Sequence, residues 1–114
     1  MRAAGAGIGG FFTPTSAGTL LGANKETRVI EGKVHVLETP LKGDVALVKA
    51  DVGDRWGNLT YNKSARNFGP TMAMAAKLTI AEVKTIKELG EISPEHVVTP
   101  GIFVDRVIKL REEQ

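Results

Sequence analysis

Six residues near the amino terminus have the spacing of a phosphate-binding loop. The run from Gly5 to Gly10 reads Gly-Ala-Gly-Ile-Gly-Gly, which matches the G-x-G-x-x-G pattern of dinucleotide sites. In such sites the glycines follow a strand and open a helix, so that a pyrophosphate can approach the helix amino terminus. Here only four residues precede the run and Pro14 follows closely, so the pattern predicts a tightly packed glycine loop rather than a dinucleotide site.

The other residue types that often do chemistry are too scattered to form a recognisable site. His35 and His96 lie far apart, and neither has a carboxylate at the spacing of a metal motif. We expect His35 to be a packing or surface residue of a strand and His96 to be a solvated turn residue. Ser16, Ser64 and Ser93 lack the G-x-S-x-G frame of a hydrolase nucleophile. No glutamate stands out as a nucleophile either, and no metal site is expected.

Composition narrows the class of protein. The chain has 114 residues, of which 42% are hydrophobic and 25% charged, as expected of one soluble domain spanning residues 1–114. Its net charge of +2 comes without a basic run, which argues against a nucleic-acid partner. There is no cysteine, and no apolar run reaches the roughly 18 residues that can span a membrane. We therefore expect a cytoplasmic protein without a membrane partner.

Hydrophobic alternation and turn residues predict an α/β domain. A β-hairpin is expected around Glu31-Gly32. The continuous apolar run Val45-Ala46-Leu47-Val48 is typical of a parallel strand that is buried on both faces. The expected elements are a loop-rich segment 1–24, the hairpin 26–38, strands 44–50, 59–61, 78–86 and 97–98, a turn at 54–58, a helix 70–77, and a strand or helix over 102–110.

Several blocks of sequence resemble one family in both order and spacing. The likeness covers residues 2 to about 109, and so many ordered blocks are far more specific than one glycine motif. The blocks are Arg2-Ala3-Ala4-Gly5-Ala6-Gly7, Phe11-Phe12-Thr13-Pro14-Thr15, Asp54-Arg55-Trp56-Gly57-Asn58-Leu59, Ala65-Arg66-Asn67-Phe68, Met72-Ala73-Met74-Ala75-Ala76, Thr79-Ile80-Ala81-Glu82-Val83 and Thr99-Pro100-Gly101-Ile102-Phe103-Val104. The chain resembles the C-terminal half of the alpha chain of family I CoA-transferases of the succinyl-CoA:3-ketoacid and acetate CoA-transferase type.

The resemblance implies a ping-pong transfer of CoA between an acyl-CoA, such as succinyl-CoA, and a short-chain or 3-keto acid. In this family a glutamate of the beta chain attacks the thioester and becomes a glutamyl-CoA thioester. That glutamate lies in a Ser-Glu-Asn-Gly motif that is absent here, so no catalytic residue is assigned to this chain. Coenzyme A is expected as a substrate, with no permanently bound cofactor and with a beta chain as partner.

The resemblance also implies a substrate or CoA pocket. Gly5, Gly7, Phe11 and Thr13 resemble the family's loop at the acyl pocket. A second segment, Arg66, Asn67 and Phe68, resembles one near that pocket, although a structural turn leading into a helix is the preferred interpretation of these residues. In the family a strand, a Gly-Gly-Phe loop and a glutamine come before the position of Met1, so these features are expected to be missing from this chain.

The resemblance implies a partial open, mostly parallel sheet with flanking helices and a β-hairpin. The family shares this α/β fold with the sugar-phosphate isomerases, and this chain would supply only its later strands. Such a half-sheet is expected to expose an edge and apolar faces, and therefore to be poorly soluble or oligomeric by itself. Three functions remain open: a component of a CoA-transferase that is inactive alone, a truncated non-catalytic remnant or interaction domain, and a small CoA-binding module. The acyl donor and the acceptor acid are left open.

Overall fold

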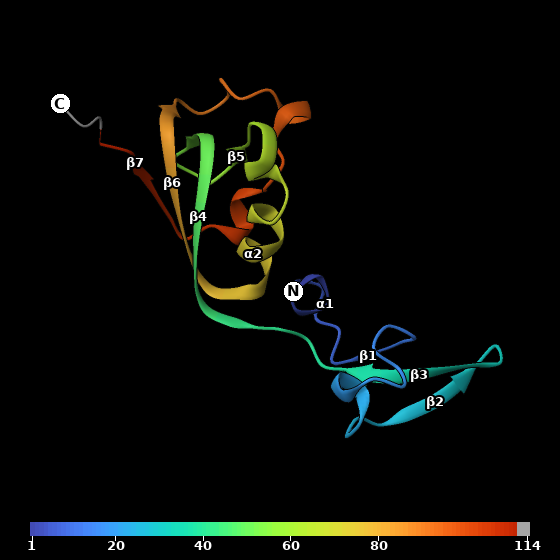
Figure 1. Cartoon of the computed structure of the whole chain (residues 1–114). Helices are drawn as coiled ribbons and strands as arrows, with labels where there is room; N and C mark the ends of the chain where they lie inside the picture. The colour runs from blue at the N-terminus through green and yellow to red at the C-terminus, as the bar shows by residue number, and fades with distance from the viewer. Residues whose placement is uncertain (112–114) are drawn as a thin grey trace.

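The computed structural model describes residues 1–111, which form two separate β-sheets and two short α-helices (Figure 1). The first sheet lies at one end of an elongated molecule, and the second sheet with its helix forms the body. The helices and strands are α1 (Arg2–Gly5), β1 (Phe11–Thr13), β2 (Thr27–Ile30), β3 (Lys33–Glu38), β4 (Gly43–Asp54), β5 (Leu59–Thr60), α2 (Gly69–Ala75), β6 (Ala76–Lys87) and β7 (Arg106–Lys109).

The first sheet is antiparallel, with strand order β1-β3-β2. Its β2–β3 hairpin turns at Glu31 and Gly32, whose φ angles of 49° and 75° are both positive. Two positive φ angles are the signature of the tight type I′ turn, whose twist matches that of the flanking strands. The predicted hairpin is confirmed, and it projects away from the body (Figure 1).

The second sheet has the order β5-β4-β6-β7 and is mostly parallel. β4, β6 and β7 run in the same direction, while the two-residue β5 is antiparallel to β4. β4 and β6 pair along nearly their whole length, from Gly43 opposite Ala76 to Asp54 opposite Lys87. The predicted α/β architecture with an open, mostly parallel sheet is confirmed.

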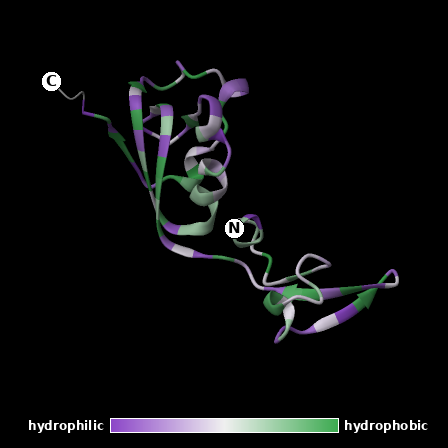
Figure 2. Ribbon diagram, viewed as in Figure 1, coloured by the Kyte–Doolittle hydropathy of each residue, from purple (hydrophilic) through white to green (hydrophobic). Residues whose placement is uncertain are grey.

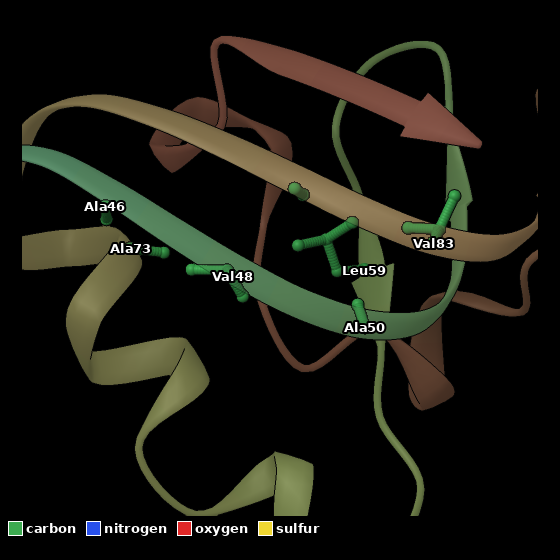
Figure 3. Close-up of a cluster of buried hydrophobic side chains, with 7 residues drawn as sticks. Ala46, Val48, Ala50, Leu59, Ala73 and Val83 are labelled. Atoms are coloured by element: carbon green, nitrogen blue, oxygen red, sulfur yellow. The ribbon is translucent and has the colours of Figure 1, made fainter. Parts of the chain in front are cut away.

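Helix α2 covers one face of the second sheet. Pro70 occupies its first turn, where a missing backbone N–H costs nothing. Figure 3 shows Ala73 of α2 beside Ala46 and Val48 of β4, and the small alanines let helix and sheet approach closely. α2 ends at Ala75 and β6 starts at the next residue. The buried cluster consists of Ala46, Val48, Ala50, Leu59, Ala73, Ala81 and Val83.

The opposite face of the second sheet is bare in the described part of the chain. Side chains of a strand alternate between faces, so Val45 and Leu47 point away from α2 and are 53% and 71% exposed. Ile108 of β7 is 50% exposed as well. The prediction that residues 45–48 are buried on both faces was therefore wrong, because within residues 1–111 a helix packs on one face only.

The turn between β4 and β5 is tied to a distant segment by side-chain hydrogen bonds. Asp54 Oδ1 accepts bonds from the backbone N–H groups of Trp56 (2.9 Å) and Asn58 (3.1 Å). Asn58 Nδ2 donates to Asp54 Oδ2 over 2.8 Å, and Asn58 Oδ1 accepts the N–H of Gly101 over 3.0 Å. Gly57 supplies the positive φ (87°) that this predicted turn needs. The turn thus anchors the segment that returns from β6.

Two sequence predictions need correction. Val97 and Val98 form no strand, because the backbones of Val98 and Thr99 pair with the single residue Leu59 in an isolated bridge. The segment 1–24, expected to be rich in loops, contains α1 and β1, because Phe11–Thr13 pairs with β3. The segment 102–110 was expected as a strand or a helix, and it contains strand β7 after a 3-10 turn at Gly101–Phe103.

Candidate functional site

The two glycines predicted for a pocket serve the packing and the turn of the amino-terminal segment. Gly5 ends α1 against α2: a Cβ atom there would lie 2.5 Å from Met74 Cβ, so only glycine allows this approach. Gly7 has a φ of 71° and open space around it. The prediction of a closely packed glycine loop therefore holds at Gly5, which docks α1 on α2, but not at Gly7 and Gly9, where a Cβ atom would meet nothing within 4 Å.

Phe11 and Thr13 lie together on β1 and line a cavity of about 380 Å³. The other lining residues come from the start of the chain and from the segment after β3: Met1, Thr15, Glu38, Thr39 and Leu41. Phe11 is 43% exposed. Two of the predicted site residues are thus brought together at an open cavity beside the first sheet.

Asn67 and Phe68 line a different cavity of about 290 Å³, together with Met1, Arg2 and Thr71. Phe68 is the residue before α2 and is 60% exposed. Met1 contributes to both this cavity and the one at Phe11 and Thr13. These two pairs of predicted residues therefore lie on either side of the amino terminus.

Arg66 is separated from its sequence neighbours. It lines a third cavity, of about 600 Å³, at the far side of the short 3-10 helix Lys63–Arg66. This cavity, called here the strand-end cavity, is lined by Val52, Thr60, Tyr61, Arg66, Lys87, Glu91, Ile92, Ser93, Glu95, His96, Val97 and Val98. Val52 and Lys87 lie at the carboxyl ends of the parallel strands β4 and β6, where open α/β sheets commonly bind ligands.

Tyr61 in the wall of the strand-end cavity is held by one hydrogen bond. Its phenol oxygen lies 2.7 Å from the hydroxyl of Thr99, which is buried. Burial raises the pKa of Tyr61, and the hydrogen bond with Thr99 lowers it in part. The phenol therefore stays protonated at neutral pH and can donate or accept a hydrogen bond without carrying charge.

A family model described as coenzyme A transferase matches residues 1–110. The chain belongs to the coenzyme A transferase family. The resemblance predicted from the sequence blocks is thereby confirmed.

Curated relatives of this coenzyme A transferase chain agree that it corresponds to the alpha chain. The matching chain of the 3-oxoadipate CoA-transferase of Pseudomonas putida is 66% identical over 108 residues, which are 95% of this chain and 47% of the relative. The alpha chain of the acetate CoA-transferase of Escherichia coli (strain K12) is 46% identical over 114 residues, which are 100% of this chain and 52% of the relative. The chain thus spans about half the length of the curated relatives it matches.

A solved structure supports the fold of this coenzyme A transferase chain. An acyl-CoA transferase from Escherichia coli O157:H7, in a thioester complex with CoA, superposes with a TM-score of 0.81 at 18% identity. The match covers 99% of this chain and 26% of that one.

The strand-end cavity of this coenzyme A transferase chain contains residues that the sequence did not single out for a site. Lys87 directly follows the predicted strand 78–86 and ends the observed β6, and a charged residue at the carboxyl end of a parallel strand is a usable signal. Tyr61 and Glu91 carried no such signal. His96, an exposed turn residue as predicted, also lines this cavity. Glu91 and His96 line the same cavity as Arg66 because the segment 91–98 folds back over the ends of the strands.

Two further structural findings concern residues 1–111 of the coenzyme A transferase chain. No group of three or more His, Cys, Asp or Glu side chains among them is placed to hold a metal ion. None of their helices has the length and apolar character needed to cross a membrane.

Proposed function

We propose that this chain is part of the alpha chain of a CoA-transferase that moves CoA between an acyl-CoA and a short-chain or 3-keto acid. The family match over residues 1–110 is the observation that carries this proposal. The Pseudomonas putida relative, at 66% identity, belongs to a 3-oxoadipate CoA-transferase, and 3-oxoadipate is a 3-keto acid. A 3-keto acid is therefore the first acceptor to test, with succinyl-CoA as the donor.

In the proposed reaction the nucleophile is a glutamate of a beta chain, which becomes a glutamyl-CoA thioester between the two half-reactions. Coenzyme A is a substrate here rather than a resident cofactor. Gly5, Gly7, Phe11 and Thr13 are proposed to shape the approach to the acyl pocket, and Asn67 and Phe68 to lie beside it. The shared use of Met1 by the two small cavities supports this grouping. Arg66 lines another cavity, so its place among these pocket residues has the least structural support.

The proposed enzyme is an oligomer in the cytoplasm, in which residues 1–114 form one domain. The bare sheet face supports the association part of this proposal, because parallel sheets are normally covered on both faces. Leu47 at 71% exposure and Val45 at 53% would be buried by the remainder of an alpha chain. The chain alone is expected to be inactive.

The test is reconstitution. The chain is coexpressed with the amino-terminal half of the matching Pseudomonas putida chain and with a family beta chain, and transfer of CoA from succinyl-CoA to 3-oxoadipate, acetoacetate or acetate is measured. We expect transfer only when all three polypeptides are present. Mass spectrometry of the beta chain after incubation with acyl-CoA alone should find CoA bound as a thioester to a glutamate.

The same bare face favours one alternative, a non-catalytic remnant or interaction domain. That alternative gains support if the three polypeptides assemble into a complex that transfers no CoA to any of the acids. Equilibrium dialysis of the isolated chain against CoA addresses the third possibility, a small CoA-binding module. Saturable binding there, without a partner, would favour it over the proposed function.

A further inference from the structure

The first sheet ends in an unpaired edge. Its strand order is β1-β3-β2, and within residues 1–111 no strand pairs with the outer side of β2. All four residues of β2 are exposed, on a hairpin that stands clear of the body (Figure 1). A free edge presents backbone N–H and C=O groups that can pair with a strand of another polypeptide.

The register of the hairpin shows which backbone groups of β2 face outward. The N–H of Leu37 donates to the carbonyl oxygen of Glu26 over 2.8 Å, so Glu26, just before β2, turns its backbone groups toward β3. Successive residues of an antiparallel strand alternate between hydrogen-bonded and non-hydrogen-bonded positions. Thr27 and Val29 therefore direct their N–H and C=O groups away from β3, toward the free edge.

The features that normally protect an edge are missing from β2. Protected edges carry outward charges, a proline or a bulge. β2 contains one charged residue, Arg28, and its guanidinium lies 4.7 Å from the ring centre of Phe12 on β1, across the intervening β3. The charge is thus drawn over the sheet and away from the edge. By contrast β7, the outer strand of the second sheet, has an exposed Arg106 and an exposed Lys109.

An exposed pair of valines lies beside this edge. Val29 of β2 is opposite Val34 of β3, and opposite residues of paired strands share one face of the sheet. The two valines are 72% and 51% exposed. Two residues further along β3 the same face is covered, since Val36 is buried and the backbone of Gly22 packs against it. The apolar face therefore continues past its cover to the edge of the sheet.

A second copy of the same strand fits this edge by symmetry. A two-fold axis perpendicular to the sheet pairs β2 with itself in antiparallel orientation, and an axis at Val29 sets Val29 opposite Val29 of the second copy. Val34 and Val29 then continue into the same two valines of the second copy as one apolar row. Axes at Thr27 or Ile30 would break this row, and an axis at Arg28 would set two arginines opposite each other, which is destabilising.

We propose that two copies of this chain associate through the outer edges of β2, with Val29 opposite Val29, so that the two three-stranded sheets become one continuous sheet. Backbone hydrogen bonds between the two Val29 residues and apolar contact along the valine row stabilise the pair. β1 lies at the opposite edge, so the cavity at Phe11 and Thr13 stays open. This inference does not depend on the proposed function.

Cysteine cross-linking tests the register, because the chain contains no cysteine of its own. Opposite residues of a hydrogen-bonded antiparallel pair have Cα atoms about 5.5 Å apart, a distance that a disulfide can span. The Val29→Cys variant should therefore form a disulfide-linked dimer under mild oxidation. Val34→Cys is the matched control, since Val34 is an exposed valine on the same face, but three strand spacings, about 14 Å, would separate its two copies. We expect Val29→Cys to cross-link about tenfold faster or more.

Sedimentation of the full chain tests the contact without a covalent bond. The comparison is made in the Leu47→Lys variant, which weakens any association through the bare face of the second sheet. Adding Val29→Pro removes an outward N–H that the pairing with β3 does not use, and edge positions tolerate proline. Association should weaken by about tenfold or more, since two backbone hydrogen bonds between the copies are lost. Circular dichroism checks that both variants are folded.

Two outcomes would overturn the proposal. One is disulfide formation in Val29→Cys that is no faster than in Val34→Cys, which would indicate random collision of exposed hairpins. The other is a folded Leu47→Lys/Val29→Pro chain that associates as tightly as Leu47→Lys alone. If Val29→Pro disturbs the hairpin, the cross-linking comparison still decides, because both of its cysteine variants keep the backbone hydrogen bonds of β2 and β3.

Discussion

At the scale of single residues, Asp54 organises the turn between β4 and β5. It is 3% exposed, and its two carboxylate oxygens accept three hydrogen bonds from Trp56 and Asn58. Asn58 in turn holds Gly101, so one buried carboxylate fixes the β4–β5 turn and the segment after it. Buried acceptors of this kind cost free energy when their partners are removed.

We predict that Asp54→Asn lowers the free energy of unfolding by about 2 kcal/mol. The buried carboxylate would be replaced by an amide whose NH2 group faces the N–H donors of Trp56 and Asn58 and cannot accept their hydrogen bonds. Urea unfolding measures the change. Asp44→Asn is the matched control: its carboxylate is 87% exposed in an ion pair with Lys77, so a change under about 0.5 kcal/mol is expected. Equal losses in both variants would contradict the structural role of Asp54.

Tyr61 gives the stability of the chain a dependence on alkaline pH. Its pKa is raised by burial from the usual 10.0, so the folded state holds this proton more tightly than the unfolded state does. Its contribution to stability is fully present below pH 10.0 and is lost as the pH rises through the folded-state pKa. The Tyr61→Phe variant should lack this loss.

The measurement is urea unfolding of wild type and Tyr61→Phe between pH 8 and roughly pH 11. At pH 8 the variant is expected to be less stable by about 1 kcal/mol, since the bond to Thr99 is gone. The difference should shrink as the pH rises above 10.0, because only the wild type must ionise a buried phenol. A difference that stays constant with pH would rule out this account.

At the scale of elements, close backbone approaches decide which segments can lie side by side. A Cβ atom at Gly101 would stand 2.0 Å from the carbonyl oxygen of Trp56, so the 3-10 turn after Thr99 can reach the β4–β5 turn only with glycine there.

We therefore predict that Gly101→Ala lowers the free energy of unfolding by more than about 2 kcal/mol, since backbone atoms must move apart. Gly9→Ala is the control, because a Cβ atom there meets nothing within 4 Å; its effect should stay within about 0.5 kcal/mol. Thermal unfolding of both variants compares them. A Gly101→Ala chain as stable as the wild type would mean that the contact is easily relaxed.

Much of the element order could be read from the sequence because it follows local rules. The alternation on either side of Glu31-Gly32 predicted the hairpin, and Pro70 marked the start of α2 within one residue. Residues 97–98 were wrongly predicted to form a strand, because β-branched pairs favour strands locally, whereas this segment pairs only with the single residue Leu59. The separation of Arg66 from Asn67 depends on the returning segment 91–98, which no local pattern specifies.

At the scale of the whole molecule, the chain is extended rather than compact. Its radius of gyration is 17.8 Å, against roughly 13 Å for a compact domain of this length. The hairpin sheet stands apart from the body, and the end of β2 is hydrophobic where Figure 2 colours it green. A shape of this kind, with a bare sheet face, agrees with the expectation that the isolated chain associates.

We predict that the isolated chain sediments as an oligomer and that Leu47→Lys weakens its association by about tenfold or more, because burying a leucine in the bare face would contribute that much. Leu20→Lys is the matched control, since Leu20 is 95% exposed on a segment far from that face. Analytical ultracentrifugation distinguishes them. A wild-type chain that sediments as a compact monomer would refute the prediction.

The direct passage from α2 into β6 has a consequence for the evolution of the family. Because no residue separates Ala75 from Ala76, an inserted residue there would shift β6 by one position against β4. Each side chain of β6 would then change faces, and Val83 would leave the core for solvent. Insertions and deletions among homologues should therefore avoid this junction. They should accumulate between Lys87 and Pro94, where the chain has left the sheet and a change in length does not alter strand pairing.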